Sequence, residues 1–293
     1  MQKTETTKWN GKSRGGSFGY LFFVKALRVF GVRFAYFLIL FVAFYFIFFA
    51  PKATAASWNY HRQRLGYGRL KSAVKVYWHL CTFAKTIVDK LALRIGLANK
   101  YCFEYTGAER FLELINSGTG VVMIGAHVGC WEAGAQFFGK YGKHINIVML
   151  DDEHKKIKEV LDKNSLEQNY KIIPVNQDIF EIMVRIRQAL SSAEIVCFNG
   201  DRYIKDVTTK AEIFLGGKAK FPEGPFRIAS KCHVPVVFYY AMRESGQKYH
   251  FIFEEVKDCS DCQKIMEQYI QSLENIVRKY PEQWFNFYQF WEK

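Results

Sequence analysis

The stretch "VVMIGAHVGCWEAG", residues 121–134, contains a predicted strand, a turn and the residues of the candidate chemistry. It opens with a short apolar run that predicts a buried strand, and small residues then lead into an ionisable side chain, His127. In open α/β sheets, reactive groups gather beyond the carboxyl ends of the strands. The stretch therefore predicts a strand over 120–124, a helix over 129–140 and a reactive histidine between them.

Outward from this stretch, the chain beyond residue 100 alternates short apolar runs with helical patterns. We expect strands at 101–105, 120–124, 145–150, 171–174, 195–198, 212–215, 235–241 and 249–256. We expect helices at 107–116, 129–140, 153–168, 177–192, 224–232 and 260–279. This alternation is typical of an α/β domain whose sheet is mixed but largely parallel and flanked by helices, with the last two strands antiparallel.

The N-terminal third has a different character. Residues 1–110 hold 18 Lys and Arg against 4 Asp and Glu, so the whole excess of the +13 net charge lies there. Residues 34–50 contain no charge, and with the apolar residues before them they approach the length of a bilayer span. Because basic residues flank this segment and no nucleic-acid motif appears, the pattern favours a membrane or an acidic partner over nucleic acid. A buried core helix is the alternative.

The sequence divides into four segments. Residues 1–18 form a basic, flexible tail, and residues 19–50 form a hydrophobic, membrane-associated segment. Residues 51–100 are a basic helical region, with apolar residues at helical spacing from 69 onward. Residues 101–293 form the α/β domain. The basic helix either lies against anionic headgroups or covers the core with an ordinary solvated face, and the dense Lys and Arg on both sides of the apolar run select no membrane orientation.

His127 and the carboxylate that follows it, Glu132, form a candidate base and orienter. Glu132 would accept Nδ1–H of the imidazole, and Nε2 would then take a proton from an attacking hydroxyl, which is typically worth about 10²–10⁴ in rate. Gly129 leaves room for a substrate, and backbone N–H groups at the helix start would stabilise an oxyanion. A histidine with a purely structural role is the alternative.

Secondary candidates follow other elements of the predicted sheet. Asp201 and Arg202 end a strand at the same edge as His127, and Arg202 would suit a phosphate on the substrate; a surface ion pair is the alternative. Glu223 is either a site residue or a first-turn carboxylate favoured by the helix dipole. Arg227, one helical turn later, is a weaker candidate.

The seven cysteines follow no disulfide or zinc pattern, which indicates a reducing compartment. No metal or cofactor is expected. Cys130 lies three residues after His127, so a thioesterase-like hydrolase with a cysteine nucleophile is an alternative function. A non-catalytic membrane-interaction module is another.

The motif around His127 also carries a family resemblance. "GAHVGCWEAG" is an HX4E motif and resembles the lysophospholipid acyltransferase superfamily, in particular the lipid A late acyltransferases. Later stretches resemble the same family: "FNGDRY" (198–203), "FLGGKAKFPEGPFRIASKCHVPVV" (214–237) and "PEQWFNFYQFW" (281–291). The resemblance implies a glycerolipid-acyltransferase-like fold with an N-terminal membrane helix at the bacterial inner membrane, its catalytic domain on the cytoplasmic side. It also implies transfer of a fatty acyl chain from acyl carrier protein or acyl-CoA to a hydroxyl of a lipid A precursor-like acceptor.

Three departures from the family pattern leave the acceptor open. The C-terminal motif reads "NFYQFW" where the lipid A enzymes usually continue with His-Arg-Arg. The run "VMLDDEHKK" (148–156) lacks the arginine often found there, and "FPEGPFR" places Arg227 one position late relative to the FPEGTR block of glycerolipid acyltransferases. A lysophospholipid, an amino-acid lipid or a polyene-type lipid is therefore an alternative acceptor.

Overall fold

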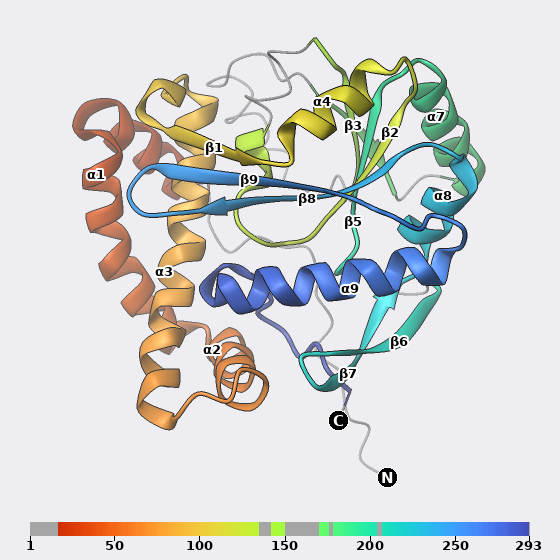
Figure 1. Cartoon of the computed structure of the whole chain (residues 1–293). Helices are drawn as coiled ribbons and strands as arrows, with labels where there is room; N and C mark the ends of the chain where they lie inside the picture. The colour runs from red at the N-terminus through yellow and green to blue at the C-terminus, as the bar shows by residue number, and fades with distance from the viewer. Residues whose placement is uncertain (1–16, 135–141, 150–169, 176–177, 204–206, 293) are drawn as a thin grey trace.

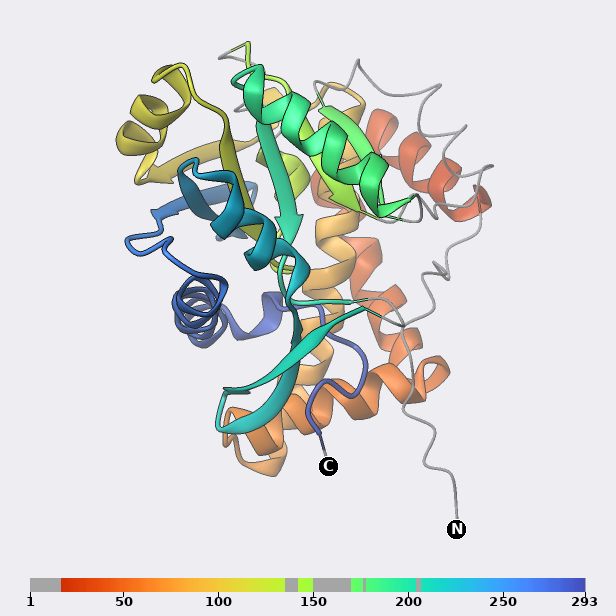
Figure 2. The ribbon, with the colours of Figure 1, turned by 90° about the vertical axis from the view of Figure 1, so that its right-hand side faces the viewer.

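The computed structural model describes residues 17–134, 142–149, 170–175, 178–203 and 207–292. It has three layers, with a sheet between two groups of helices (Figure 1). One face of the sheet packs against α1 (Ser17–Phe49), α3 (Arg69–Arg94) and α4 (Ala108–Asn116), and the other packs against α7 (Ile179–Ser191), α8 (Gly224–Cys232) and α9 (Cys262–Lys279). Figure 2 shows these layers from the side.

The central sheet has seven strands in the order β1-β9-β8-β2-β5-β3-β4. Every neighbouring pair is parallel except β8 and β9, which form an antiparallel hairpin. The predicted mixed, largely parallel α/β fold is therefore confirmed, including the antiparallel last pair. The strands are β1 (Cys102–Thr106), β2 (Val121–Gly125), β3 (Ile145–Met149), β4 (Tyr170–Pro174), β5 (Ile195–Asn199), β8 (Val236–Arg243) and β9 (Lys248–Glu255).

The strand that contains the first apolar run of the motif, β2, lies at the centre of the sheet. Val122 and Ile124 point into the core shared with α7, α8 and α9, whereas Val121 and Met123 point into the core shared with α1, α3 and α4. All four are buried. A strand covered on both faces has no polar positions to alternate, which explains the continuous apolar run.

Below the central sheet, β6 (Thr209–Phe214) and β7 (Gly217–Pro222) form a separate antiparallel hairpin. The sequence predicted only part of the first strand. Leu215 and Gly216 make the turn with φ of 49° and 69°, and such a pair of positive φ values is the geometry that favours a two-residue hairpin. The second strand was not predicted because glycines interrupt the apolar pattern before it. Its Lys side chains nevertheless alternate with buried residues such as Phe221.

The helix predicted over 129–140 differs in the structure. Gly129 has a left-handed conformation with φ of 56°, so no helix begins there, and a 3-10 helix (Trp131–Gly134) follows. Residues 135–140 and the helix predicted over 153–168 lie outside the described residues.

The two apolar pieces of the N-terminal segment form two helical stretches, together labelled α1, which meet at a kink where the backbone of Gly31 is not helical (φ 78°, ψ 179°). Pro51 occupies the first turn of α2 (Pro51–Asn59), and a π-helical turn (Tyr60–Arg64) leads on toward α3. By length and composition alone, residues Leu21–Phe49 are long and apolar enough to cross a membrane.

The two faces of α1 have different surroundings. One face packs into the core with α3 and the sheet through Val24, Leu27, Val32, Ala35 and Ile39. The opposite face exposes large apolar side chains, namely Val29, Phe30, Phe37, Phe41, Phe44 and Phe48. We call this second set the Phe face. Lys25, Arg28 and Arg33 are also exposed on the first half of α1, but beyond Arg33 the helix is apolar on both sides, so its outer surface there is unlike that of an ordinary cover helix.

Candidate active site

The register between β2 and β5 positions the site. These strands are parallel neighbours, and Gly125 is paired with Asn199. The amide of Gly200 also donates to the carbonyl of Gly125 at 2.9 Å. His127 and Asp201 each lie two residues beyond these paired positions, so the sheet brings them together although they are 74 residues apart in sequence.

His127 and Asp201 form a close polar pair. The Nδ1 atom of His127 lies 2.7 Å from Oδ1 of Asp201, and the backbone N–H of His127 donates to both carboxylate oxygens at 3.1 Å. The indole N–H of Trp284 donates to Oδ2 at 3.2 Å. A carboxylate can only accept, so this pairing assigns the proton to Nδ1, and Nε2 is then the nitrogen that accepts a proton.

His127 and Asp201 differ in exposure to solvent. The Asp201 side chain is 1% exposed, whereas the His127 side chain is 28% exposed. Burial alone would raise the pKa of Asp201, but the charge and hydrogen bonds of His127, together with the charge of Arg202, hold that pKa below its usual value. The carboxylate therefore stays ionised inside the protein while the imidazole is accessible from outside, which is the arrangement a general base requires.

The loop after His127 is fixed against the sheet by its backbone. Gly129 N–H donates to the carbonyl of Gln283 at 3.0 Å, and Cys130 N–H donates to the carbonyl of Ala241 at 2.8 Å. A Cβ atom on Gly129 would lie 2.0 Å from the Ala241 oxygen, so only glycine fits there. These amides have acceptors within the protein in place of the expected oxyanion, and the small size of Gly129 accommodates β8.

The other predicted site residues have separate surroundings. The backbone of Glu132 lies in the 3-10 helix, but its side chain is outside the described residues, so its contact with His127 stays a prediction. Arg202 donates to the carbonyl of Phe285, and its guanidinium lies 5.8 Å from the ring centre of Tyr288. It follows Asp201 directly and remains at the border of the site.

Glu223 and Arg227 lie at the start of α8 and pair with each other at 2.5 Å. The Arg227 side chain is more than half exposed. Within the described part of the chain, their side-chain ion pair connects them to each other and not to His127 or Asp201. A helical i,i+4 pair of this kind accounts for both residues without a substrate.

A mainly apolar cavity lies on the face of the sheet that β2 shares with α1, α3 and α4. It reaches Gly125, two residues before His127. Ten residues from five neighbouring strands line it, namely Met123, Gly125, Ile145, Ile147, Met149, Tyr170, Cys197, Phe198, Asn199 and Tyr239. The site therefore combines a polar pair at the sheet edge with an adjoining apolar space. Among the described residues, no group of three or more His, Cys, Asp or Glu side chains is arranged to hold a metal ion.

The family model described as "Bacterial lipid A biosynthesis acyltransferase" matches residues 70–293, well over half of the chain. The chain belongs to this family. The resemblance predicted from "GAHVGCWEAG" is thereby confirmed, and acyl transfer in lipid biosynthesis is the activity of the family to which this acyltransferase belongs. A search of the curated proteins found no match.

Two groups of this lipid A-type acyltransferase were missed by sequence reasoning. Trp284 donates to the carboxylate of Asp201, and the only signal was its place in the aromatic C-terminal motif. A second buried carboxylate, Asp89, lies in the basic helix α3 and gave no signal, since its partners are scattered along the chain.

Proposed function

We propose that the protein transfers a fatty acyl chain from a thioester donor, acyl carrier protein or acyl-CoA, to a hydroxyl of a lipid acceptor. His127 acts as the general base, and Asp201 orients it. The observation that supports this most directly is the 2.7 Å contact between His127 Nδ1 and a buried, ionised Asp201 in a lipid A-type acyltransferase.

The proposed reaction needs one base and no covalent enzyme intermediate. Nε2 of His127 removes the proton from the acceptor hydroxyl as its oxygen attacks the thioester carbonyl. The resulting imidazolium is stabilised by the carboxylate of Asp201. When the tetrahedral intermediate collapses, the C–S bond breaks, and the proton on His127 passes to the leaving thiolate. The products are the acylated lipid and the free thiol, and the histidine returns to its neutral form.

We keep Glu132 in the proposed site as a second carboxylate of the HX4E motif. The sequence spacing suggested Glu132 as the residue that orients His127, but three observations support Asp201 in that role. The ends of β2 and β5 are in register, Asp201 lies 2.7 Å from Nδ1 of His127, and the Asp201 side chain is almost completely buried. Arg202 stays our candidate for binding an anionic group of the donor or the acceptor. Glu223, Arg227 and Gly129 have structural explanations and are weaker candidates.

The apolar cavity below Gly125 supports an acyl donor. A fatty acyl chain placed there has its hydrocarbon away from water and its thioester close to the end of β2, where His127 lies. We propose a lipid A precursor-like acceptor because of the family, and the alternative lipid acceptors remain open to the same chemistry.

We place the enzyme at the bacterial inner membrane with its α/β domain in the cytoplasm, where thioester donors are made. The Phe face of α1 supports contact with the hydrocarbon region, and the excess of Lys and Arg in residues 1–110 supports contact with anionic headgroups or an acidic carrier. Since α1 packs along the domain by its other face, we propose an embedded rather than an isolated helix.

The test is transfer of a radiolabelled acyl chain to lipid by His127→Ala. We expect kcat to fall by about 10²–10⁴, the usual contribution of a general base. The matched control is His144→Ala, which removes an exposed histidine before β3 and should leave the rate unchanged. Thermal unfolding confirms that both variants are folded. Retained transfer in His127→Ala would overturn the assignment of the base. If the wild-type protein released free fatty acid in place of acylated lipid, it would be a hydrolase.

A further inference from the structure

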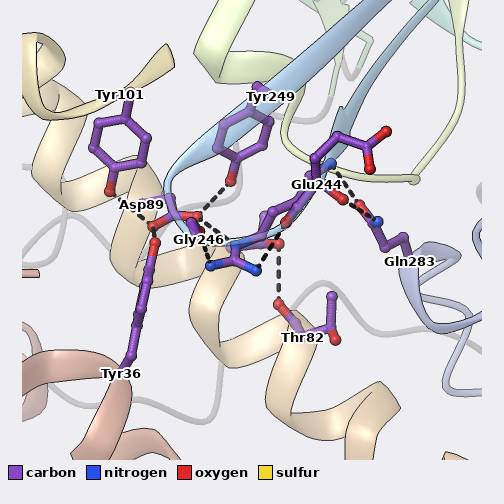
Figure 3. A network of polar contacts seen from close by, with 10 residues as sticks. Tyr36, Thr82, Asp89, Tyr101, Glu244, Gly246, Tyr249 and Gln283 are labelled. Carbon is purple, nitrogen blue, oxygen red and sulfur yellow. Dashed lines mark hydrogen bonds and ion pairs between the residues drawn. The ribbon is translucent and has the colours of Figure 1, made fainter. Parts of the chain in front are cut away.

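Asp89 lies at the centre of a buried polar cluster that joins α1, α3 and the sheet (Figure 3). Its Oδ1 accepts from the hydroxyls of Tyr36 and Tyr101, the latter at 2.8 Å. Its Oδ2 accepts from the hydroxyl of Tyr249 at 2.5 Å and from Nε of Arg243 at 3.1 Å. The guanidinium of Arg243 also lies 4.8 Å from the ring centre of Tyr36. The position of α1 and the end of β8 are therefore fixed by the same carboxylate.

The backbone of Arg243 continues this contact series toward the active site. Its N–H donates to Oε1 of Gln283 at 2.8 Å, and Nε2 of Gln283 donates back to the Arg243 carbonyl at 2.6 Å. One side-chain amide thus satisfies both backbone groups of the residue that ends β8. Gln283 is only 7% exposed, so water competes little with these bonds.

The backbone of Gln283 holds the loop that carries the catalytic histidine. Its carbonyl accepts the N–H of Gly129 at 3.0 Å, and the N–H of Phe285 donates to the carbonyl of His127 at 3.0 Å. Between them, Trp284 donates its indole N–H to Asp201. Both members of the catalytic pair are therefore held by the segment that Gln283 ties to β8.

We propose that Gln283 is a positioning residue for His127, and that the contact series Tyr36–Asp89–Arg243–Gln283 makes the catalytic geometry depend on the seating of α1. This inference rests on the proposed role of His127 as a base. As a consequence, α1 contributes to the chemical step without contacting the substrate. This is the helix with the Phe face, which we propose contacts the membrane.

The first test is Gln283→Met, which keeps the length of the side chain and removes both hydrogen bonds to Arg243. We expect kcat to fall about 10- to 100-fold, because small displacements of catalytic groups have effects of that size, with KM for the donor unchanged. Gln283→Glu keeps an acceptor for the Arg243 N–H and should recover part of the loss. If the residue acted by packing alone, Met would be tolerated and Glu would be worse, which would overturn the proposal.

The second test concerns α1. Tyr36→Phe removes only the hydroxyl that reaches Asp89, and Tyr77→Phe is its matched control, because the Tyr77 hydroxyl also joins α3 to α1 but contacts the Leu40 carbonyl, outside the series. We expect Tyr36→Phe to lower kcat about 3- to 10-fold and Tyr77→Phe to have less than about a 2-fold effect. Equal effects of the two variants would overturn the proposal.

A double-mutant cycle distinguishes coupling from two independent defects. If the series is continuous, Tyr36→Phe should have little further effect on kcat in the Gln283→Met background. Multiplying effects would mean that the two residues act independently, and the series would be rejected. If His127→Ala is inactive and Gln283→Met is fully active, only the positioning role of Gln283 is rejected. If His127→Ala is active, the proposed role of His127 as a base is rejected.

Discussion

Two buried aspartates of this acyltransferase are surrounded in opposite ways. Asp201 and Asp89 are both inaccessible to solvent, and each accepts at least three hydrogen bonds. The main partner of Asp201 is His127, more than a quarter of whose side chain is exposed. The partners of Asp89 are three tyrosines and Arg243, whose side chain is 11% exposed.

These surroundings shift the pKa values of the two carboxyl groups in opposite directions. At Asp201 the nearby charges lower the pKa despite burial, so the fold favours the ionised form. At Asp89 burial raises the pKa and outweighs the opposing effect of Arg243 and the tyrosine hydroxyls. A buried carboxylate with an accessible basic partner can take part in a reaction. A buried carboxylate that is surrounded only by hydrogen-bond donors instead holds helices and strands together.

The largest expected effect tests the Asp201 side of this comparison. Asp201→Asn keeps the size of the side chain but no longer fixes the Nδ1–H tautomer of His127 or stabilises the imidazolium, so we expect kcat to fall about 10²–10⁴-fold. The measurement is steady-state acyl transfer, with thermal unfolding to confirm folding. Glu132→Gln is the matched comparison: a larger loss there would return the orienting role to Glu132.

The next effect tests Asp89 as a joint. Asp89→Ala leaves Arg243 buried beside three tyrosine hydroxyls, so we expect the free energy of unfolding to fall by about 3–5 kcal/mol. Asp258→Ala, which removes an exposed partner of Lys264, should change it by less than about 1 kcal/mol. Denaturant unfolding of the detergent-solubilised protein measures both. Equal stability of the two variants would contradict the assignment of Asp89 to the core.

The smallest expected effect concerns how the contributions of Asp201 and Asp89 to folding stability change with pH, because the two should change in opposite directions. The pKa of Asp201 is lowered in the folded state, so its contribution to stability is present above about pH 4 and is lost as the pH falls through the folded-state value. The pKa of Asp89 is raised, so its contribution is greatest below about pH 4 and declines as the pH rises through its folded-state value. The stability difference between wild type and Asp201→Asn, and that between wild type and Asp89→Asn, should therefore change in opposite directions from about pH 3 to 7 in denaturant unfolding.

The sequence predicted the α/β fold and the edge of the sheet where the proposed site lies. Apolar runs and helical periodicity indicated the alternation of strands and helices, and the rule on strand ends placed His127 and Asp201 at one edge. Spacing alone could not decide which carboxylate contacts the imidazole. Glu132 is closer in sequence, but the register of two strands places Asp201 beside Nδ1.

Other features had no readable signal. Asp89 is a single acid in a basic helix, and its four partners come from three separate parts of the chain. Gln283 has an ordinary polar side chain whose role depends on the end of a distant strand. In both cases the information lies in long-range pairing, which local periodicity and capping patterns do not contain.

The register of β2 and β5 has a consequence for folding. A slip of one residue between these strands would move Asp201 by about 3.3 Å along the strand and turn its side chain toward the opposite face. No misaligned sheet could keep the contact between His127 and Asp201, which closes a loop of 74 residues. If His127 and Asp201 act as proposed, catalytic activity reports correct strand pairing, and a chain that has collapsed with the wrong alignment would be compact yet inactive.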